Sequence, residues 1–127
     1  LYTTPELQAD KELVLAAVSQ FGWVLQFATP ELKADKDVVL AAVSQDGGAL
    51  EFATPELQAD KEVVLAAVSR YGEALLYATP ELRDDLEVVS AAIAQNPEAI
   101  QSASERIKNN PELLQESEQA YKRRKTK

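Results

Sequence analysis

Residues 29–53 read TPELKADKDVVLAAVSQDGGALEFA, and close copies of this stretch recur through most of the 127-residue chain. Its opening motif, Thr-Pro-Glu-Leu, begins at residues 4, 29, 54 and 79, a constant step of 25. Self-similarity at a fixed period of roughly 20–50 residues is typical of repeat proteins. We therefore predict four repeats and a different C-terminal end. The repeats cover residues 4–28, 29–53, 54–78 and 79–103, followed by a cap at 104–121 and a basic tail at 122–127.

Each repeat has the pattern of a helix. In the second repeat, Asp35 precedes the apolar run and can accept hydrogen bonds from the first turn of a helix. Val39 and Val43 are four residues apart, so they lie on one apolar stripe. Gly47 follows, and glycine tolerates the left-handed conformation that ends many helices. A second, shorter helix is predicted at residues 49–53.

A single repeat is too small to fold alone, because it offers only seven large apolar side chains. Stacked helical repeats bury a core that continues from one unit to the next. The predicted fold is therefore all-α: a short α-solenoid of about four 25-residue helical-hairpin repeats with a C-terminal capping helix. The first repeat lacks a preceding repeat to pack against, and we expect the chain to be part of a longer array.

The C-terminal end departs from the repeat. Ser104-Glu105 replaces Thr-Pro, which predicts one continuous helix over residues 97–108. Asn110-Pro111 then begins a final helix that caps the array with a polar outer face. The last residues, 122–127, are expected to fray into a tail.

The repeated pattern also resembles a known family. The sequence D-K-E-V-V-L-A-A-V-S-x-x-G, followed by A-L-x-[FY]-A, is similar to the repeats of the domain of unknown function 4116, and the resemblance covers residues 5–103. It implies short helical repeats within larger proteins, including proteins of bacteria that live inside other cells. It implies no activity and no site residue.

The composition excludes several kinds of site. The chain contains no Cys and no His, which removes disulfides, thiol catalysis, zinc–thiolate sites and the commonest general base. The four recurring aspartates are explained by helix capping rather than by metal binding. The serines near the helix ends, Ser19, Ser44 and Ser69, have no His to activate them. We expect no enzymatic activity, no cofactor and no metal.

Charge is unevenly distributed. Residues 1–104 carry 6 basic and 17 acidic side chains, a net charge of −11, whereas residues 105–127 carry 7 and 4, a net charge of +3. An acidic body disfavours binding along a phosphate backbone. The alternative is that the basic tail contacts nucleic acid or an anionic membrane. Its basic residues are Lys122, Arg123, Arg124, Lys125 and Lys127.

Partner recognition is expected where the repeats differ, because packing explains what they share. Three variable positions of the repeat carry charged or small polar residues in some copies, which predicts that these positions are exposed. In other copies they carry apolar groups, and clustered aromatics often anchor interfaces. The alternative is that Phe21 and Trp23 cover the end of the array. The candidate interaction residues are Phe21, Trp23, Tyr71 and Leu76.

These observations favour a non-enzymatic module for protein–protein interaction or scaffolding within a larger intracellular or secreted effector protein. An accessory domain of an enzyme encoded elsewhere in a longer chain is an alternative. No apolar run reaches the length of about 20 residues that a membrane-spanning helix needs. A cytoplasmic location is expected, and the sequence predicts neither the partner nor the oligomeric state.

Overall fold

The computed structural model describes residues 10–125, and every regular element among them is helical. Three kinds of helix recur every 25 residues. The long helices are α2 (Lys11–Gln20), α4 (Lys36–Gln45), α6 (Lys61–Arg70) and α8 (Leu86–Gln95). The 3₁₀ helices are η1 (Gly22–Phe27), η2 (Gly47–Phe52), η3 (Gly72–Tyr77) and η4 (Pro97–Ser102). The short turns are α3 (Pro30–Lys33), α5 (Pro55–Gln58), α7 (Pro80–Arg83) and α9 (Glu105–Lys108), and α10 (Pro111–Lys125) follows.

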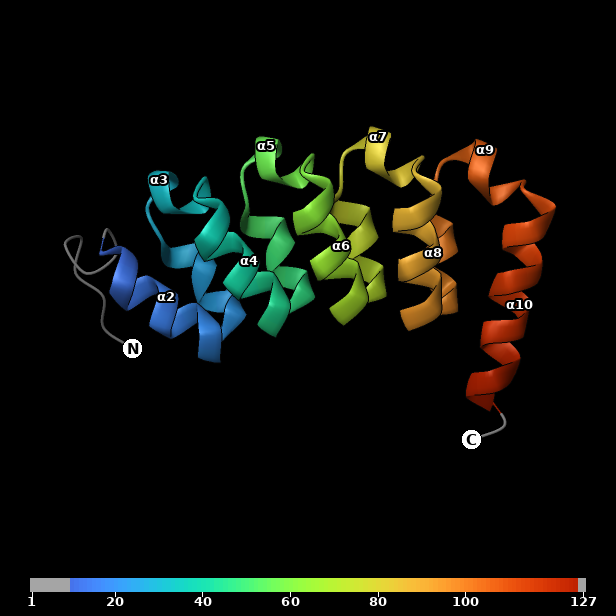
Figure 1. Cartoon of the computed structure of the whole chain (residues 1–127), viewed down its shortest axis with the longest axis horizontal. Coiled ribbons are helices and arrows are strands. Elements are labelled where there is room, and N and C mark those ends of the chain that lie inside the picture. Colours follow the sequence, from blue (N-terminus) through green and yellow to red (C-terminus); the bar gives the residue numbers. More distant parts are fainter. Residues whose placement is uncertain (1–9, 126–127) are drawn as a thin grey trace.

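The helices form two layers that run along the array (Figure 1). Each long helix contacts the next long helix, and each 3₁₀ helix contacts the next 3₁₀ helix. The layers are tied together because α4 packs against both η2 and the preceding η1, an arrangement that α6 and α8 repeat. Helix α10 packs against α8 and η4 and takes the place of a fifth long helix. The chain is thus a short α-solenoid, as predicted.

Aspartate capping begins each long helix, as the sequence predicted. The Asp35 carboxylate accepts from the backbone N–H of Asp37 and Val38 at 3.0 and 3.3 Å. Asp60 accepts from the N–H of Val63 at 3.2 Å. Side chains that accept from these otherwise unpaired donors stabilise a helix start by about 1 kcal/mol each.

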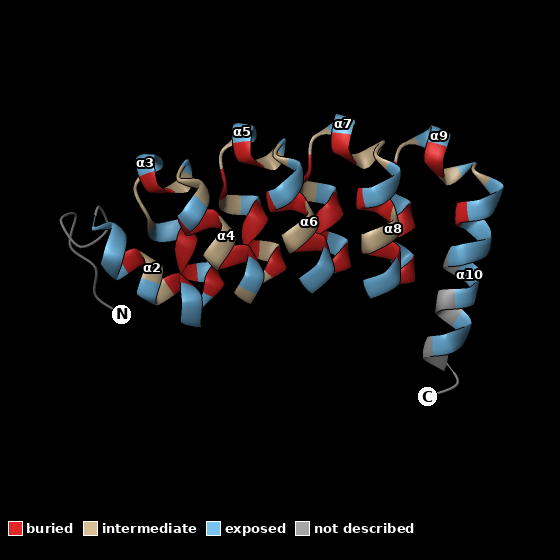
Figure 2. Ribbon diagram, viewed as in Figure 1, coloured by how far each residue is buried: buried red, intermediate tan, exposed pale blue. Residues whose placement is uncertain are grey.

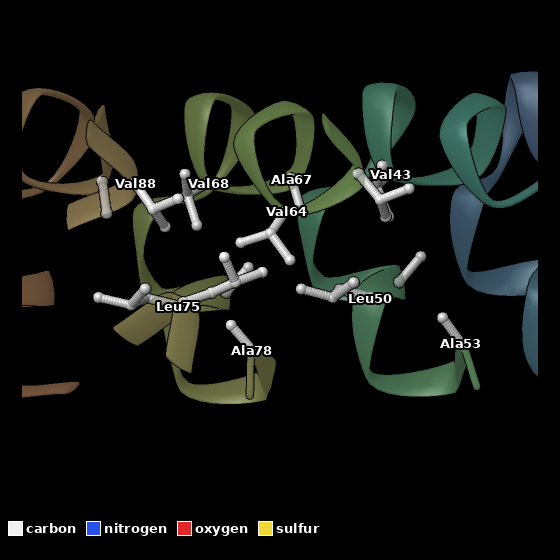
Figure 3. Packing of buried hydrophobic residues seen from close by; sticks show 14 of the residues in the cluster. Val43, Leu50, Ala53, Val64, Ala67, Val68, Leu75, Ala78 and Val88 are labelled. Atoms are coloured by element: carbon white, nitrogen blue, oxygen red, sulfur yellow. The ribbon is translucent and has the colours of Figure 1, made fainter. Parts of the chain in front are cut away.

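The core lies between the two layers and is continuous (Figure 2). Each interior long helix buries two adjacent valines and, one turn later, an alanine beside a valine or isoleucine. Figure 3 shows Val64 and Val68 of α6 on the side that faces Leu50 and Leu75 of the 3₁₀ helices. Because α6 packs against both η2 and η3, its valines contact side chains from two repeats. The core of one repeat therefore cannot form without its neighbour.

The second helix of the repeat differs from its prediction. A helix was expected over residues 49–53, whereas the structure has a 3₁₀ helix that begins at Gly47. The buried residues Gly47, Leu50 and Ala53 are spaced by three. A 3₁₀ helix has three residues per turn, so this spacing places all three on one face.

The expected role of the repeated glycine was also wrong. No described glycine has a positive φ. Helix α4 is followed instead by Asp46, whose φ of −144° is extended, and Gly47 begins the next helix. Gly47 packs so closely on the next repeat that a Cβ atom there would collide with the carbonyl oxygen of Ala67 and lie 2.8 Å from the Cβ of Tyr71. Glycine is needed at this position for backbone approach rather than for a left-handed turn.

The continuous helix predicted over residues 97–108 is interrupted. Ala103 and Ser104 are extended, and the Ser104 hydroxyl accepts from the N–H of Ile107 to begin α9. The Ser104 N–H donates to the carbonyl oxygen of Arg83 at 2.9 Å. The Thr54 N–H makes the same bond to the previous repeat. The Ser104 side chain thus makes the cap that Thr29 makes at α3, and the loss of proline does not remove the break.

The predicted frayed tail is also largely helical. Helix α10 continues to Lys125, so the expected boundary between a cap at 104–121 and a tail at 122–127 does not coincide with the end of a helix. Lys127 lies outside the described residues. At about 1.5 Å per residue, the five extra residues of α10 make it about 7 Å longer than α8. Figure 1 shows its C-terminal turns projecting past the end of α8.

Ion pairs connect successive long helices at the edge where they begin. Each lysine bridges forward to the capping aspartate of the next repeat and to a second acid two residues further on. The distances to the capping aspartate are 3.0 Å for Lys11–Asp35, 3.1 Å for Lys36–Asp60 and 3.1 Å for Lys61–Asp85.

At the fourth repeat this pattern changes, because Leu86 stands where the first three repeats have lysine. A different ion pair connects this repeat to α9: Arg106 contacts the Asp84 carboxylate at 2.9 Å. The contact between the array and its C-terminal helices is therefore chemically distinct from the contacts between repeats.

The close approach at Gly47 predicts different outcomes for two adjacent glycines. Gly47→Ala should destabilise the protein by about 1–3 kcal/mol, because the new methyl group has to displace backbone. Gly48→Ala is the matched control, since its Cβ would meet the Asp46 carboxylate at 3.3 Å and the Tyr71 ring at 3.8 Å. Thermal unfolding measures both. Equal melting temperatures for the two variants would contradict the packing described here.

The ion pairs predict how stability depends on pH. Burial alone would raise the pKa of Asp60, but the hydrogen bonds from Lys36 and the Val63 N–H outweigh it and lower this pKa below 3.8. The hydrogen bonds to Glu62 and Asp60 raise the pKa of Lys36 above 10.5. Asp35 and Asp85 shift in the same direction as Asp60, and Lys11 and Lys61 in the same direction as Lys36.

A group with a lowered pKa stabilises the folded state above its unfolded pKa and stops doing so as the pH falls. A group with a raised pKa stabilises below its unfolded pKa and stops doing so as the pH rises. Melting temperature should therefore fall below about pH 4 and again above about pH 10.5. Lys36→Met should reduce the fall in melting temperature at acid pH, because Asp60 loses its ion-pair partner. If the melting temperature of that variant fell by the same amount at acid pH, the ion pairs would not stabilise the array.

Candidate interaction surface

The variable positions of the repeats form one surface along the array, which we call the variable ridge. It contains the residue between each long helix and the following 3₁₀ helix, together with the second and fifth residues of that 3₁₀ helix. The members are Phe21, Trp23, Gln26, Asp46, Gly48, Glu51, Tyr71, Glu73, Leu76, Asn96, Glu98 and Gln101.

Backbone geometry explains why the second and fifth residues of each 3₁₀ helix face outward. In the third repeat, Gly72, Leu75 and Ala78 are buried, whereas Glu73 and Leu76 are exposed. Residues three apart share a face of a 3₁₀ helix, so the inner and outer faces are each defined by a spacing of three. The same packing that buries the inner face exposes the ridge positions.

Contacts between repeats make the ridge continuous. The Asn96 side-chain amide donates to the Glu73 carboxylate of the preceding repeat at 3.2 Å. Gly48 occupies the position of Glu73 one repeat earlier, and a Cβ built there would lie 3.8 Å from the Tyr71 ring. The second ridge position of one repeat is therefore next to the first ridge position of the following repeat.

The four predicted interaction residues are all exposed. The exposed fractions are 47% for Phe21, 44% for Trp23, 40% for Tyr71 and 53% for Leu76. Tyr71 occupies the same position in its repeat as Phe21, and its repeat has a neighbour on both sides. Exposure of an aromatic residue at this position therefore does not require the end of the array.

An aromatic cluster lies at the first repeat. The ring centroids of Phe21 and Trp23 are 6.0 Å apart, and those of Trp23 and Phe27 are 6.3 Å apart with an edge-to-face arrangement. Such geometry is favourable between aromatic rings. Sequence reasoning missed Phe27, because the corresponding residues Phe52 and Tyr77 belong to the shared pattern and are half-buried.

The third repeat presents a more polar group. The Tyr71 hydroxyl donates to the Glu73 carboxylate at 2.8 Å, and this hydrogen bond raises the pKa of Tyr71 above 10.0. Leu76 lies one 3₁₀ turn beyond Glu73. The structure thus places Phe21 and Trp23 together and places Tyr71 and Leu76 two repeats away, with Asp46 and Gly48 between them on the ridge.

Local structure accounts for some ridge residues but not for others. Asp46 and Asn96 each cap the 3₁₀ helix that follows, accepting from the N–H of Gly48 at 3.0 Å and of Glu98 at 3.1 Å. Phe21 and Tyr71 occupy the same position without a side-chain capping bond. A cap contributes about 1 kcal/mol, so the aromatic residues have no comparable local role.

The basic residues are separate from the exposed aromatic groups and belong to α10. Lys122 and Arg123 are exposed. Arg124 and Lys125 are in the same helix, but their side chains, like the whole of Lys127, lie outside what the structure describes. Within residues 10–125, no group of three or more acidic side chains is arranged to hold a metal ion. None of the helices described could span a bilayer, given their lengths and apolar content.

Comparison with known proteins identifies a family of repeats. The sequence model of a family described as "Domain of unknown function (DUF4116)" matches twice, at residues 10–58 and 60–108. Each match spans nearly two of the 25-residue repeats. Searches of curated proteins and of solved structures gave no significant match.

Proposed function

We propose that this chain, which belongs to the family described as a domain of unknown function (DUF4116), is a non-catalytic scaffold that binds another protein through the variable ridge. The observation that carries the proposal is the exposure of Phe21, Trp23, Tyr71 and Leu76 on this one surface. The repeats are nearly identical inside and differ outside, so differences between them have little effect on packing.

The absence of a local role supports this proposal. Asp46 and Asn96 stabilise the helices that follow them, whereas Phe21 and Tyr71 at the same position do not. Large aromatic side chains that are exposed to water and cap no helix are typical of contact sites, where aromatic residues contribute much of the binding energy. The repeats thus combine two copies that favour stability with two copies that favour contact.

The chemistry of the ridge indicates the kind of partner. Neighbouring repeats of packed helices are about 8–10 Å apart, so Phe21 and Tyr71 are separated by roughly 16–20 Å along the array. An extended segment of about five or six residues covers that distance. Asp46, Glu51 and Glu73 add negative charge between and beside the apolar groups. The partner should present apolar side chains accompanied by Lys or Arg.

Peptides selected from a display library on the intact protein test this proposal. Trp23→Ala and Tyr71→Ala should each weaken the best peptide at least tenfold, equivalent to about 1.4 kcal/mol, by removing an aromatic anchor. Their melting temperatures should change little because neither side chain belongs to the buried core. Binding is measured by titration calorimetry and stability by thermal unfolding.

Leu114→Ala is the matched control, because Leu114 is also exposed but lies on α10, which contributes no residue to the ridge. It should leave peptide affinity within about twofold. The proposal fails if selected peptides bind equally to all variants. If Trp23→Ala lowers stability as much as binding, Trp23 serves to cover the end of the array.

The exposed Lys122 and Arg123 on the projecting turns of α10 favour a second candidate function. A cluster of basic groups attracts polyanions in a salt-dependent manner. Retention on heparin and on anionic vesicles, with and without residues 122–127, distinguishes this function from peptide binding. Loss of retention on deletion would support contact with nucleic acid or membrane, whereas no retention by either form would exclude it.

A further inference from the structure

The residue of the second repeat that lies next to the Tyr71 ring is a glycine, so it places no side chain against that ring. Gly48 occupies the second ridge position, where the other repeats carry Trp23, Glu73 and Glu98. A Cβ atom built on Gly48 would lie 3.8 Å from both the Cδ2 and the Cε2 atoms of Tyr71. A longer side chain at position 48 would therefore contact the ring and reduce its exposure.

Neither backbone conformation nor close packing requires glycine at position 48. No described glycine has a positive φ. The shortest contact of the added Cβ atom would be 3.3 Å to the Asp46 carboxylate, which is the end of a side chain and can move. Gly47, by contrast, has no room for a Cβ atom against the backbone of Ala67. The gap beside the Tyr71 ring is thus a local feature that the fold does not need.

Hydrogen bonds hold the Tyr71 ring in one orientation. Its hydroxyl donates to one oxygen of the Glu73 carboxylate at 2.8 Å, and the Asn96 side chain donates to the other oxygen at 3.2 Å. Tyr71 is nevertheless 40% exposed. A side chain that is already ordered loses little conformational entropy when a ligand binds, so this ring is a favourable contact.

Negative charge lies beside the ring. The hydrogen bond to Glu73 is the main cause that raises the pKa of Tyr71 above 10.0, and the charge of Asp46 also raises it. Arg70 precedes Tyr71 in the chain, but its Nε atom donates to the carbonyl oxygen of Gln45 at 3.3 Å. Within the described part of the chain, no basic side chain forms an ion pair with Asp46 or Glu73. These carboxylates can therefore pair with a cation from a ligand.

We infer that Asp46, Gly48, Tyr71 and Glu73 form a binding site for one arginine side chain of the partner. A guanidinium group is planar, packs against aromatic rings and pairs with carboxylates. Gly48 leaves space for this group beside Tyr71, Asp46 supplies the opposite charge, and Glu73 orients the ring. The inference rests on the proposed function, because the arginine belongs to the segment bound along the ridge, and it adds the type and the place of one partner residue.

Selection from a random peptide library on the intact protein tests the inference first at the level of sequence. The peptides that bind should share an arginine at one position. Replacing this arginine with citrulline keeps the planar shape but removes the charge. The replacement should weaken binding by at least about tenfold in titration calorimetry, because the ion pair and the attraction to the ring are both lost.

Asp46→Asn tests the site from the side of the protein. Asn96 caps the fourth 3₁₀ helix at the equivalent position, so asparagine can keep the cap while removing the charge. In this variant the preference for arginine over citrulline should fall from about tenfold to about twofold. Glu98→Gln is the matched control, because it removes one charge from the same ridge in the fourth repeat. It should leave the preference unchanged.

Gly48→Gln tests the gap beside the ring. The fold should accommodate this side chain, because Glu73 and Glu98 have the same length at the equivalent positions, and thermal unfolding checks that it does. Peptides selected on this variant should no longer share an arginine.

The results separate this inference from the proposed function. Selected peptides that lack a shared arginine, or that keep the same preference over citrulline in Asp46→Asn, would overturn the arginine site. The proposed function would still stand if Trp23→Ala and Tyr71→Ala weakened those peptides. Failure of both variants to weaken any selected peptide would overturn the arginine site and the proposed function together.

Discussion

The structure depends on the close approach of the first residue of each 3₁₀ helix to the end of the next long helix. Gly22 and Gly47 contact the carbonyl oxygens of Ala42 and Ala67 so closely that a Cβ atom has no room. The Gly22 N–H also donates to the side chain of Gln45. This contact fixes one register between successive repeats, so the lysine–aspartate pairs can recur at every step. Pro97 occupies the same position where α10 replaces a ten-residue helix, and the demand for glycine ends there.

One consequence of this packing is a division of each repeat into a constant interior and a variable exterior. The inner face of the 3₁₀ helix is buried against long helices, so its residues are restricted to Gly, Ala, Val, Leu, Ile or Pro. The outer face has no such restriction and carries residues as different as Trp23, Gly48 and Glu73. Solenoid proteins commonly use extended surfaces of this kind for binding, because a rigid array holds side chains at fixed intervals. The variable ridge is such a surface, with its apolar groups in the first and third repeats.

The two ends of the array differ in whether the face of the terminal repeat is covered by another helix. At the C-terminal end, α10 covers the last repeat, and the Arg106–Asp84 pair replaces the repeated lysine pairs. At the N-terminal end, the first repeat exposes the apolar position, Leu13, that other repeats bury. A cap ends an array by giving it a polar outer face.

The sequence by itself determined the repeat, its helical character, the aspartate caps and the exposure of the four apolar ridge residues. These follow from spacing and from local hydrogen bonding, which depend on residues close together in the chain. It did not lead to the 3₁₀ helices, although the spacing of Gly47, Leu50 and Ala53 by three is a signal that could have predicted them. The break at Ser104 and the exposure of Phe27 depended on contacts with other repeats. Only the tertiary structure decided why glycine recurs. The backbone of the next repeat, 20 residues further along the chain, leaves no room for a Cβ atom at this position.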